Sequence, residues 1–276
     1  PDVRAYALSA ASQGILESVR AWPSNPQDIG PISAMRIFDG QHLPVRFDAK
    51  AMQTSALAFM VAAPTLLDSL AQAIRFNPKI TLANQVQEAT LQVICEGRSG
   101  QLRQQLGVEF TSQSYEQTAV AFKVKHSHPH EQVARQWFEN GDIIAMLPMA
   151  NQECSVVWSC SPEKAQQLLA LNEQPEKVAE QLSQIGQGVL GATYGSLELL
   201  SPCQAWPLVR STAIQWTGPS WVLAGDAAHT VHPLTGQGLN LGLADAAELS
   251  KVLANKPSWR AISDTKVLLQ YQRARK

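Results

Sequence analysis

Apolar side chains recur at helical spacing in several segments of the chain, and these segments predict helices. Residues 9–22 form one such segment, with Ser9 as its N-cap and Pro23 at its end. Residues 65–76 form another, which follows Pro64 in a first turn, where proline loses no useful hydrogen-bond donor. The remaining predicted helices are residues 162–171, 175–185 and 239–253.

Alternation of apolar and polar residues predicts strands elsewhere in the chain. The predicted strands are residues 35–38, 43–47, 80–86, 91–95, 118–124, 132–138, 143–147, 154–158, 196–206 and 221–224. Four of them follow one another in the middle of the chain, with Asn140-Gly141 among their connections, which indicates an antiparallel sheet inserted between mixed α/β segments. Between the first two strands, Asp39-Gly40 predicts a tight hairpin turn.

The composition limits what the protein can be. Its 276 residues, 45% of them hydrophobic, suit one large or two modest domains with a packed core and exclude a disordered or fibrous chain. A net charge of −1 provides no global field for polyanions, so we expect no nucleic acid partner. No apolar run reaches the ~20 residues needed to cross a bilayer. The cysteines follow no zinc-like spacing and nothing resembling a secretion signal precedes them, which favours free thiols in the cytoplasm.

Residues 225–242 combine a strand end, a carboxylate, a glycine-rich turn and a helix start. A carboxylate at a strand tip, here Asp226, can accept hydrogen bonds from the hydroxyls of a ribose or ribityl chain. Gly236 and Gly238 let the backbone approach a ligand, and the following helix presents free N–H groups and the positive end of its dipole. Apolar side chains on nearly every side of residues 239–253 predict a helix buried between a sheet and a second domain.

Residues 232–245 read H-P-L-T-G-Q-G-L-N-L-G-L-A-D and closely resemble the second FAD-binding motif of the class A flavoprotein aromatic hydroxylases, specifically the ubiquinone-biosynthesis hydroxylase family of 2-polyprenylphenol and 2-polyprenyl-6-methoxyphenol hydroxylases. Thr235 departs from the family, which usually has Ala or Gly there. The FAD-binding residues that the resemblance implies are Arg4, Gly225, Asp226, Pro233, Gly236, Gly238, Leu239 and Asn240. It also places Pro233 and Gln237 near the flavin, and it assigns neither a catalytic acid or base nor a metal ligand.

Two other segments are similar to motifs of the same family. Residues 2–9 contain R-x-x-A-L-S, whose arginine lies beside the flavin in the family, and this resemblance makes Arg4 a cofactor contact. Residues 93–100 are similar to a strand followed by D-G-x-x-S, a motif shared by FAD and nicotinamide contacts, with Glu96 in place of the usual aspartate.

The resemblance implies a mixed α/β (α+β) fold, in which an FAD/NAD(P)-binding Rossmann-like domain carries an inserted antiparallel β-sheet substrate domain. The FAD-binding domain is expected in residues 1–30, 49–112 and 207–276, and the substrate domain in residues 31–48 and 113–206. The family opens with a strand, G-x-G-x-x-G and a helix that cradle the FAD pyrophosphate, and we find no such unit. We therefore expect a sequence shortened at both ends and near residues 89–90.

The activity that the resemblance implies is FAD-dependent monooxygenation in ubiquinone biosynthesis: NAD(P)H reduces the flavin, O2 adds to form a C4a-hydroperoxide, and the ring of a polyprenylated phenol takes up one oxygen. The helix start at residues 236–240 is expected to stabilise negative charge at the flavin N1–C2=O edge, Pro233 to shape the loop over the isoalloxazine, and Gln237 to contact the ring or the substrate. The apolar tail implies a cytoplasmic protein, peripheral on the cytoplasmic face of the inner membrane, with other ubiquinone-synthesis proteins as partners and a homo-oligomer allowed.

Other functions fit parts of the pattern. A class A hydroxylase of a soluble phenol would share these motifs, and a flavin-free homologue acting as an assembly partner in a quinone-synthesis complex would explain the absent glycine-rich opening. A hydrolase is disfavoured, because no G-x-S-x-G elbow accompanies Asp226 and His229. Structural roles also compete at single positions, since Asp226 can cap a helix and Arg4 can be an ordinary surface residue.

The histidines and the apolar residues of the predicted sheet also allow two interpretations. His229 and His232, spaced i, i+3, suit a metal pair but lack a partnering cysteine or carboxylate cluster. A second histidine group, in an extended stretch that allows a surface metal tract or a solvated loop, consists of His126, His128 and His130. The sheet residues that can line an apolar pocket or form an ordinary core are Trp137, Phe138, Met146, Leu147, Pro148 and Trp158.

Overall fold

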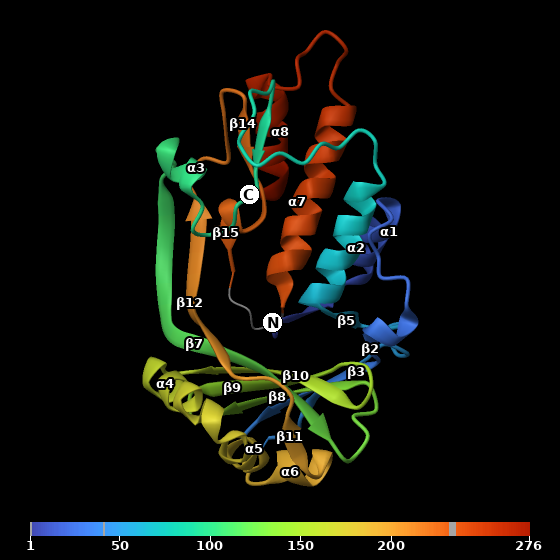
Figure 1. Ribbon diagram of the computed structural model, residues 1–276, viewed down its shortest axis with the longest axis vertical. Coiled ribbons are helices and arrows are strands. Elements are labelled where there is room, and N and C mark those ends of the chain that lie inside the picture. The colour runs from blue at the N-terminus through green and yellow to red at the C-terminus, as the bar shows by residue number, and fades with distance from the viewer. Residues whose placement is uncertain (1, 41, 232–235) are drawn as a thin grey trace. The chain divides into compact units, whose positions relative to one another are not determined.

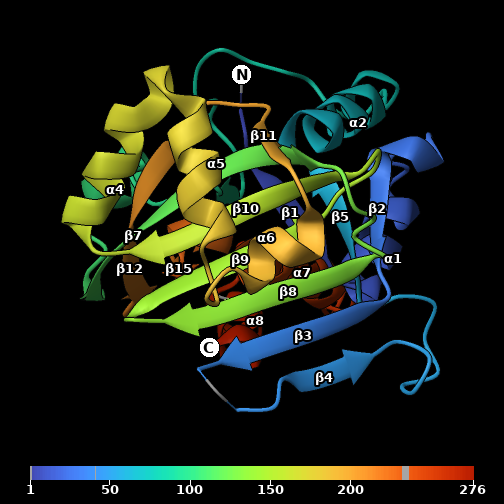
Figure 2. The same cartoon turned by 90° about the horizontal axis from the view of Figure 1, so that it is seen from below.

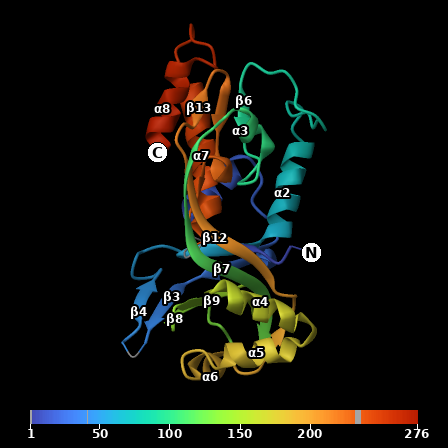
Figure 3. The ribbon, with the colours of Figure 1, turned by 90° about the vertical axis from the view of Figure 1, so that its left-hand side faces the viewer.

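A computed structural model describes residues 2–40, 42–231 and 236–276, and the chain forms two compact units (Figure 1). The first unit comprises Pro1–Gln13, Val19–Ala73 and Glu116–Leu208, and the second comprises Gly14–Ser18, Ile74–Tyr115 and Val209–Lys276. Helix α1 (Ala10–Ser18) and two long strands, β7 (Phe110–His126) and β12 (Gln204–Ala213), contribute residues to both units (Figure 3). Each unit has its own hydrophobic core.

Two sheets form the first unit. The smaller sheet is antiparallel, in the order β1-β5-β2. In the larger sheet the order is β7-β10-β9-β8-β3-β4, β11 pairs with β7, and β3 and β8 run parallel. The bounds of these strands are β1 (Ala5–Leu8), β2 (Ile29–Ile32), β3 (Ala34–Asp39), β4 (Val45–Asp48), β5 (Ala58–Ala62), β8 (Val133–Glu139), β9 (Asp142–Pro148), β10 (Glu153–Cys160) and β11 (Leu197–Leu199).

Three helices lie against one face of this larger sheet, namely α4 (Pro162–Ala170), α5 (Pro175–Ser183) and α6 (Val189–Tyr194) (Figure 2). Alternate residues of the strands point to that face, and the sheet and the helices bury Phe122, Trp158, Leu168 and Tyr194 together. Trp158, which could have lined an apolar pocket or belonged to an ordinary core, therefore lies in the core. The same part of the chain also contains helix α2 (Ala63–Arg75) and the short 3-10 helices η1 (Pro26–Asp28) and η2 (Leu171–Glu173).

The second unit contains a three-stranded sheet in the order β13-β14-β6, in which β14 and β6 run parallel. Helices α7 and α8 lie side by side in this unit (Figures 1 and 3), and their packing buries Leu249, Val252 and Tyr271 against Val222 and Leu223. The bounds of the elements are β6 (Gln92–Ile94), α3 (Gln101–Gln105), β13 (Thr217–Gly218), β14 (Trp221–Leu223), η3 (Gly225–Ala227), β15 (His229–Thr230), α7 (Gln237–Ala254) and α8 (Thr265–Arg275).

Several predicted elements are present in the structure. The four strands of the middle segment pair as predicted, and Glu139 opposite Asp142 closes a two-residue turn at Asn140-Gly141. The cap of α1 is also present, since the Ser12 amide donates to Ser9 Oγ over 3.2 Å. No helix of the described ranges has both the length and the hydropathy that a membrane span requires.

Four predictions of local structure are wrong. Residues 80–86 form no strand; they lie in a fully exposed stretch of residues 75–90 that pairs with no sheet of the described structure. The β3–β4 hairpin exists, but its last pair is Ile37 with Val45, so the connection is longer than a tight turn at Asp39-Gly40. The strand predicted for residues 196–206, with Pro202 at an edge or bend, is not continuous: it breaks next to that proline into β11 and β12, because proline donates no ladder hydrogen bond.

The fourth wrong prediction concerns the burial of α7. Its apolar residues are not covered on nearly every side: Leu239, Leu241 and Leu243 are only half-buried. The buried positions are Asp245, Leu249 and Val252, at spacings of four and three. These spacings place one face of α7 against the core, so within the described structure the helix is amphipathic in its packing.

Candidate functional site

Asp226 lies on the short turn η3, which directly follows β14 in the second unit. Its side chain is exposed, and within the described ranges its carboxylate takes part in no hydrogen bond or ion pair. The turn begins at Gly225, whose φ of +61° lies in the left-handed region that disfavours a side chain. The sequence therefore folds so that a strand end presents an unengaged carboxylate to solvent.

The start of helix α7 lies beside this carboxylate. A Cβ placed on Gly238 would come 4.0 Å from the nearest Asp226 oxygen, Oδ1, and would meet no other described atom closer. Gly236 is the N-cap and has no side chain with which to cap the first turn, and the start of an α-helix presents backbone N–H groups that lack intrahelical acceptors. Leu239 and Asn240 are half-buried, Gln237 is exposed, and the Asn240 amide donates to the Gly236 carbonyl over 3.4 Å.

These groups fit the sugar-like chain and the anionic edge of FAD. A polyol needs acceptor oxygens such as those of Asp226, and electron-rich ring atoms need N–H donors such as those at the start of α7. The absent Cβ at Gly238 leaves room between the two sets of groups. Pro233, which was predicted to lie near the flavin, falls outside the described residues, as do His232 and Thr235.

A buried ion network underlies this turn. The side chain of Asp245 on α7 is fully buried, and its Oδ2 accepts hydrogen bonds from the Gly225 amide over 2.9 Å and from His229 Nε2 over 2.7 Å. Its Oδ1 accepts from Arg275 Nε over 2.7 Å. Burial by itself raises the pKa of Asp245, but the hydrogen bonds from His229, Arg275 and Gly225 outweigh it and hold that pKa below its usual range.

Aromatic residues and α8 enclose the same network. The indole of Trp216 stacks on the His229 ring, with 4.9 Å between centroids and 15° between planes. The Trp216 amide donates to Gln272 Oε1 over 2.8 Å, and the Tyr271 hydroxyl donates to the Leu223 carbonyl over 2.9 Å. His229 is therefore engaged with Asp245 and Trp216. In the sequence, His229 was considered as a possible metal ligand together with His232, and its contacts with Asp245 and Trp216 were not predicted.

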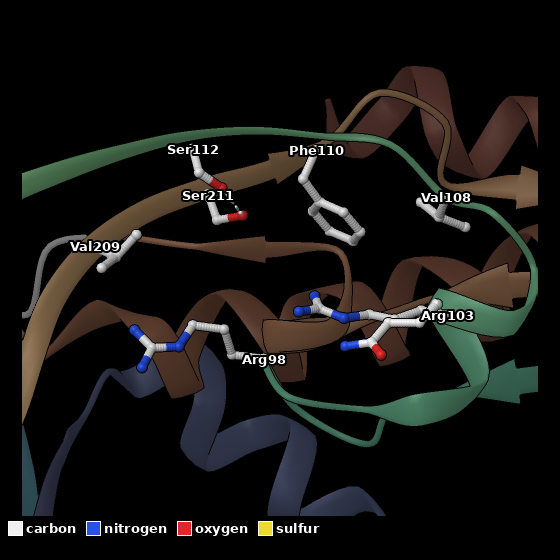
Figure 4. A pocket seen from close by; sticks show the side chains of 8 residues that line it. Arg98, Arg103, Val108, Phe110, Ser112, Val209 and Ser211 are labelled. Carbon is white, nitrogen blue, oxygen red and sulfur yellow. Dashed lines mark hydrogen bonds between the residues drawn. The ribbon is translucent and has the colours of Figure 1, made fainter.

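A cavity of about 310 Å³ opens elsewhere in the second unit (Figure 4). Its lining residues come from α3, β7, β12 and the loops next to them, and they are Arg98, Arg103, Gln104, Val108, Phe110, Ser112, Val209 and Ser211. Ser112 Oγ donates to Ser211 Oγ over 3.0 Å, and in Figure 4 the two arginines face this serine pair and Phe110. The cavity thus combines positive charge, hydroxyl groups and one aromatic ring.

Arg103 is a buried charged residue of this cavity. Its side chain lies with Cζ 4.3 Å from the Phe110 ring centroid, and its Nη1 donates to the Ala227 carbonyl over 3.3 Å. Its Nε is buried without a hydrogen-bond partner in the described structure, and burial lowers the pKa of the guanidinium. The sequence prediction missed Arg103, although the residue lies three positions after the D-G-x-x-S-like segment.

Glu96 and Arg4, two residues of the predicted motifs, make local contacts. The Glu96 side chain lies over Gly100, and its Oε1 accepts a hydrogen bond from the Arg103 amide over 3.1 Å, which stabilises the first turn of α3. Arg4, in the first unit, pairs with Asp2 through Nε and Nη2 and lies 5.9 Å from the ring of Trp206. The hydrogen bonds from Arg4 lower the pKa of Asp2. A contact of Arg4 with FAD stays a prediction.

The letters G-x-G-x-x-G do occur in the chain, at Gly186, Gly188 and Gly191. Gly186 and Gly188 lie between α5 and α6 in the first unit, Gly191 lies within α6, and the element directly before them is a helix rather than a strand. A pyrophosphate cradle requires a strand, the glycine turn and a helix in that order. This segment therefore does not supply the opening unit that the resemblance implies.

Two of the three clustered histidines are held by the backbone. His126 Nδ1 donates to the His128 carbonyl over 2.7 Å, and His130 Nε2 donates to the Met149 carbonyl over 2.9 Å. Desolvation lowers the pKa of both rings. In the part of the chain that the structure describes, no three His, Cys, Asp or Glu side chains come together as a metal site.

Comparisons with known proteins identify the family to which the chain is similar. A profile described as FAD binding domain matches residues 79–276. The chain is 30% identical over 301 residues to 3-demethoxyubiquinol 3-hydroxylase of Escherichia coli, covering 100% of this chain and 74% of that protein. It is 27% identical over 273 residues to ubiquinone hydroxylase UbiL of Rhodospirillum rubrum, covering 91% of this chain and 62% of that protein.

Solved structures give the same fold at lower identity. PqsL of Pseudomonas aeruginosa, a probable FAD-dependent monooxygenase, superposes with a TM-score of 0.80 at 18% identity, covering 99% of this chain and 82% of that chain. The p-nitrophenol 4-monooxygenase PnpA of Pseudomonas putida does so with a TM-score of 0.76 at 16% identity, covering 98% and 74%. The predicted mixed α/β, Rossmann-like FAD-binding fold is thereby confirmed.

Proposed function

We propose that this chain, which belongs to the FAD binding domain family and to its ubiquinone-biosynthesis hydroxylases, is part of an FAD-dependent monooxygenase that hydroxylates the aromatic ring of a polyprenylated phenol. The observation that carries the proposal is the exposed Asp226 carboxylate beside the open Gly238 position at the start of α7. The names of two relatives, 3-demethoxyubiquinol 3-hydroxylase and ubiquinone hydroxylase UbiL, support the substrate class.

FAD, when bound, supplies the redox chemistry by which one oxygen atom of O2 enters the ring. Asp226 accepts hydrogen bonds from the polyol, with Gly225 setting the turn that presents it. The amides around Gly236, Gly238, Leu239 and Asn240 donate to the electron-rich edge of the ring. Arg4, Pro233 and Gln237 belong to the proposal as further contacts. No side chain of this set is assigned as a catalytic acid or base.

NAD(P)H is the proposed electron donor, and the cavity beside α3 is its proposed site. A dinucleotide carries phosphate groups, which the guanidiniums of Arg98 and Arg103 can bind, and flat rings, which can stack on Phe110. The unpartnered Nε of Arg103 supports this assignment, because a buried donor without an acceptor is costly unless a ligand completes it.

The same proposal assigns one set of segments to FAD binding and another to binding of the phenol. Residues 1–30, 49–112 and 207–276 bind FAD, and residues 31–48 and 113–206 bind the phenol. The polyprenyl tail of the phenol is dissolved in the lipid phase. The protein therefore works as a peripheral protein at the cytoplasmic face of the inner membrane, beside other ubiquinone-synthesis proteins. A homo-oligomer is compatible with every step.

The proposal is tested by FAD binding at equilibrium, with the protein expressed at its full encoded length. Native protein should quench flavin fluorescence on titration, and Asp226→Asn should weaken the affinity roughly tenfold, since one charged acceptor is lost. Glu248→Gln is the matched control, because Glu248 forms only a surface pair with Lys251 on α7 among the described residues. Equal affinities of native and Asp226→Asn protein would contradict the assigned role of this carboxylate.

A second measurement addresses the substrate. NAD(P)H oxidation should be stimulated by a prenylated phenol, with the hydroxylated ring identified by mass spectrometry. Stimulation by a water-soluble phenol instead would identify a different class A hydroxylase. A native protein that neither binds FAD nor consumes NAD(P)H would favour the assembly-partner function and rule out the monooxygenase.

A further inference from the structure

Asp245 connects four segments of the second unit through one carboxylate. It projects from α7 and receives hydrogen bonds from the turn η3, from β15 and from α8, through Gly225, His229 and Arg275 respectively. Both oxygens are used, and the side chain is fully buried. A buried carboxylate with three donors is a rigid junction, because moving any partner leaves a charge or a donor unsatisfied.

The charges in the junction are balanced. Arg275 supplies the positive charge that compensates the Asp245 carboxylate, and its Nη2 also donates to the Leu241 carbonyl on α7 over 3.2 Å. Because Asp245 is held ionised, the 2.7 Å contact from His229 requires a proton on Nε2. The stacked Trp216 ring fixes the plane of the imidazole. One side chain of α8 thus neutralises and orients a carboxylate of α7.

The position of Gly225 gives the junction a consequence beyond stability. Gly225 immediately precedes Asp226, and its amide is the donor that Asp245 holds. Gly225 is in the left-handed conformation, so the hydrogen bond to its amide selects one orientation of the turn. Helix α8 reinforces this orientation from the other side, since Tyr271 holds the Leu223 carbonyl two residues before Gly225.

We infer that Asp245 is a positioning residue for FAD: with Arg275 as its counter-ion, it fixes the Gly225 amide and thereby orients the Asp226 carboxylate toward the polyol of the cofactor. The inference rests on the proposed function, because it requires that Asp226 binds FAD. Asp245 itself does not contact the cofactor in this scheme. Its contribution is pre-organisation, which raises affinity by removing the need to order the turn on binding.

The test is a double-mutant cycle on FAD affinity. Asp245→Asn replaces one acceptor oxygen by an NH2 group that faces the donors Gly225, His229 or Arg275, so the affinity should fall up to roughly tenfold, the loss expected for Asp226→Asn itself. In an Asp226→Asn background the same change should cost less than threefold, because the carboxylate that Asp245 orients is already gone. Glu248→Gln on the same helix should leave the affinity unchanged in both backgrounds.

A merely structural role gives a different result. In one such result, Asp245→Asn lowers the free energy of unfolding without FAD, while the FAD affinity of the folded protein stays at the native value. In another, the FAD affinity falls equally in the native and the Asp226→Asn backgrounds. Either result overturns the inference. Arg275→Lys, which keeps the charge but not the guanidinium fork, covers the case in which Asp245→Asn does not fold. Its affinity should fall three- to tenfold in the native background and less than twofold with Asp226→Asn.

The cycle also separates this inference from the proposed function. If native protein binds FAD and Asp226→Asn weakens it, while Asp245→Asn and Arg275→Lys do not, then only the inference fails. If native protein binds no FAD, the proposed function fails and the inference with it.

Discussion

The backbones of Gly225 and Gly242 are in close contact, since a Cβ on Gly242 would lie 3.3 Å from the Cα of Gly225. The turn η3 that carries Asp226 therefore lies directly on helix α7, with no side chain between them. Both glycines are therefore needed for the turn to lie against the helix at the candidate site. The contact also explains why Gly242 occurs inside a helix, where glycine is otherwise unfavourable.

Gly242→Ala should destabilise the second unit and weaken FAD binding. The neighbour of the new methyl group is backbone, which yields poorly, so a strain of about 1–3 kcal/mol outweighs the gain of about 1 kcal/mol in helix propensity. Gly14→Ala in α1 is the control, since a Cβ there meets nothing within 4 Å and should stabilise the protein by up to about 1 kcal/mol. Urea unfolding measures both; an equal gain in the two variants would contradict the close contact.

The free energy of unfolding should depend on pH through Asp245. The folded pKa of this group lies below its ordinary value of 3.8, so its stabilising contribution is fully present above about pH 4 and is lost as the pH falls through the folded value. The charged or titratable groups around it are His229, Arg275, Cys95 and Tyr271. Native protein should therefore lose more stability than Asp245→Asn between pH 5 and about pH 2.5, measured by urea unfolding. Parallel curves would contradict a lowered pKa.

Arg103→Met should affect the electron donor rather than the oxygenation of the phenol. Loss of the guanidinium removes a charged donor from the cavity, so KM for NAD(P)H should rise roughly tenfold or more while kcat changes little. Arg103→Lys keeps the charge and should restore part of the affinity. Steady-state NAD(P)H oxidation gives both constants. An unchanged KM in Arg103→Met, with the protein folded, would place the donor elsewhere.

One thiol per chain should react rapidly with a disulfide reagent at pH 8. Cys95 is exposed, although partial desolvation raises the pKa of its thiol. The other three are buried, and desolvation raises the pKa of Cys154 to about 12 and those of Cys160 and Cys203 to about 11. They should react only after unfolding. Cys95→Ser should abolish the rapid phase, and a second rapid thiol would contradict the burial of the sheet core.

Sequence patterns predicted the middle sheet well because β8 pairs with β9 and β9 with β10, so three of its four strands have a partner next to them in the chain. Asn140-Gly141 closes a two-residue turn, and the residues on either side alternate for a sheet with one buried face. The strand predicted at residues 80–86 shows the same alternation but has no partner strand, so the backbone hydrogen bonds that would stabilise it are absent. Alternation predicts a strand only where a partner exists.

The candidate site was predictable where the residues are adjacent in sequence and not where they meet through the fold. Asp226 and Gly238 belong to one motif, so their proximity follows from it. Arg275 is 30 positions from Asp245 and Arg103 is 124 positions from Ala227, and no local pattern joins either pair. An aspartate directly after the apolar residues at the start of α7 was the available signal for Asp245, since a buried charge requires a partner.

Residues 76–90 are exposed throughout and form no helix or strand, so a protease should cut there first, for example at Lys79. Within the first unit, β3 lies before this stretch and β8 after it, and they pair from Ala34 opposite Val133 to Asp39 opposite Phe138. Met60 also packs with Ala134 across the same break. A nicked chain should therefore stay together as two complementing fragments, and the protein can be assembled from separately labelled halves.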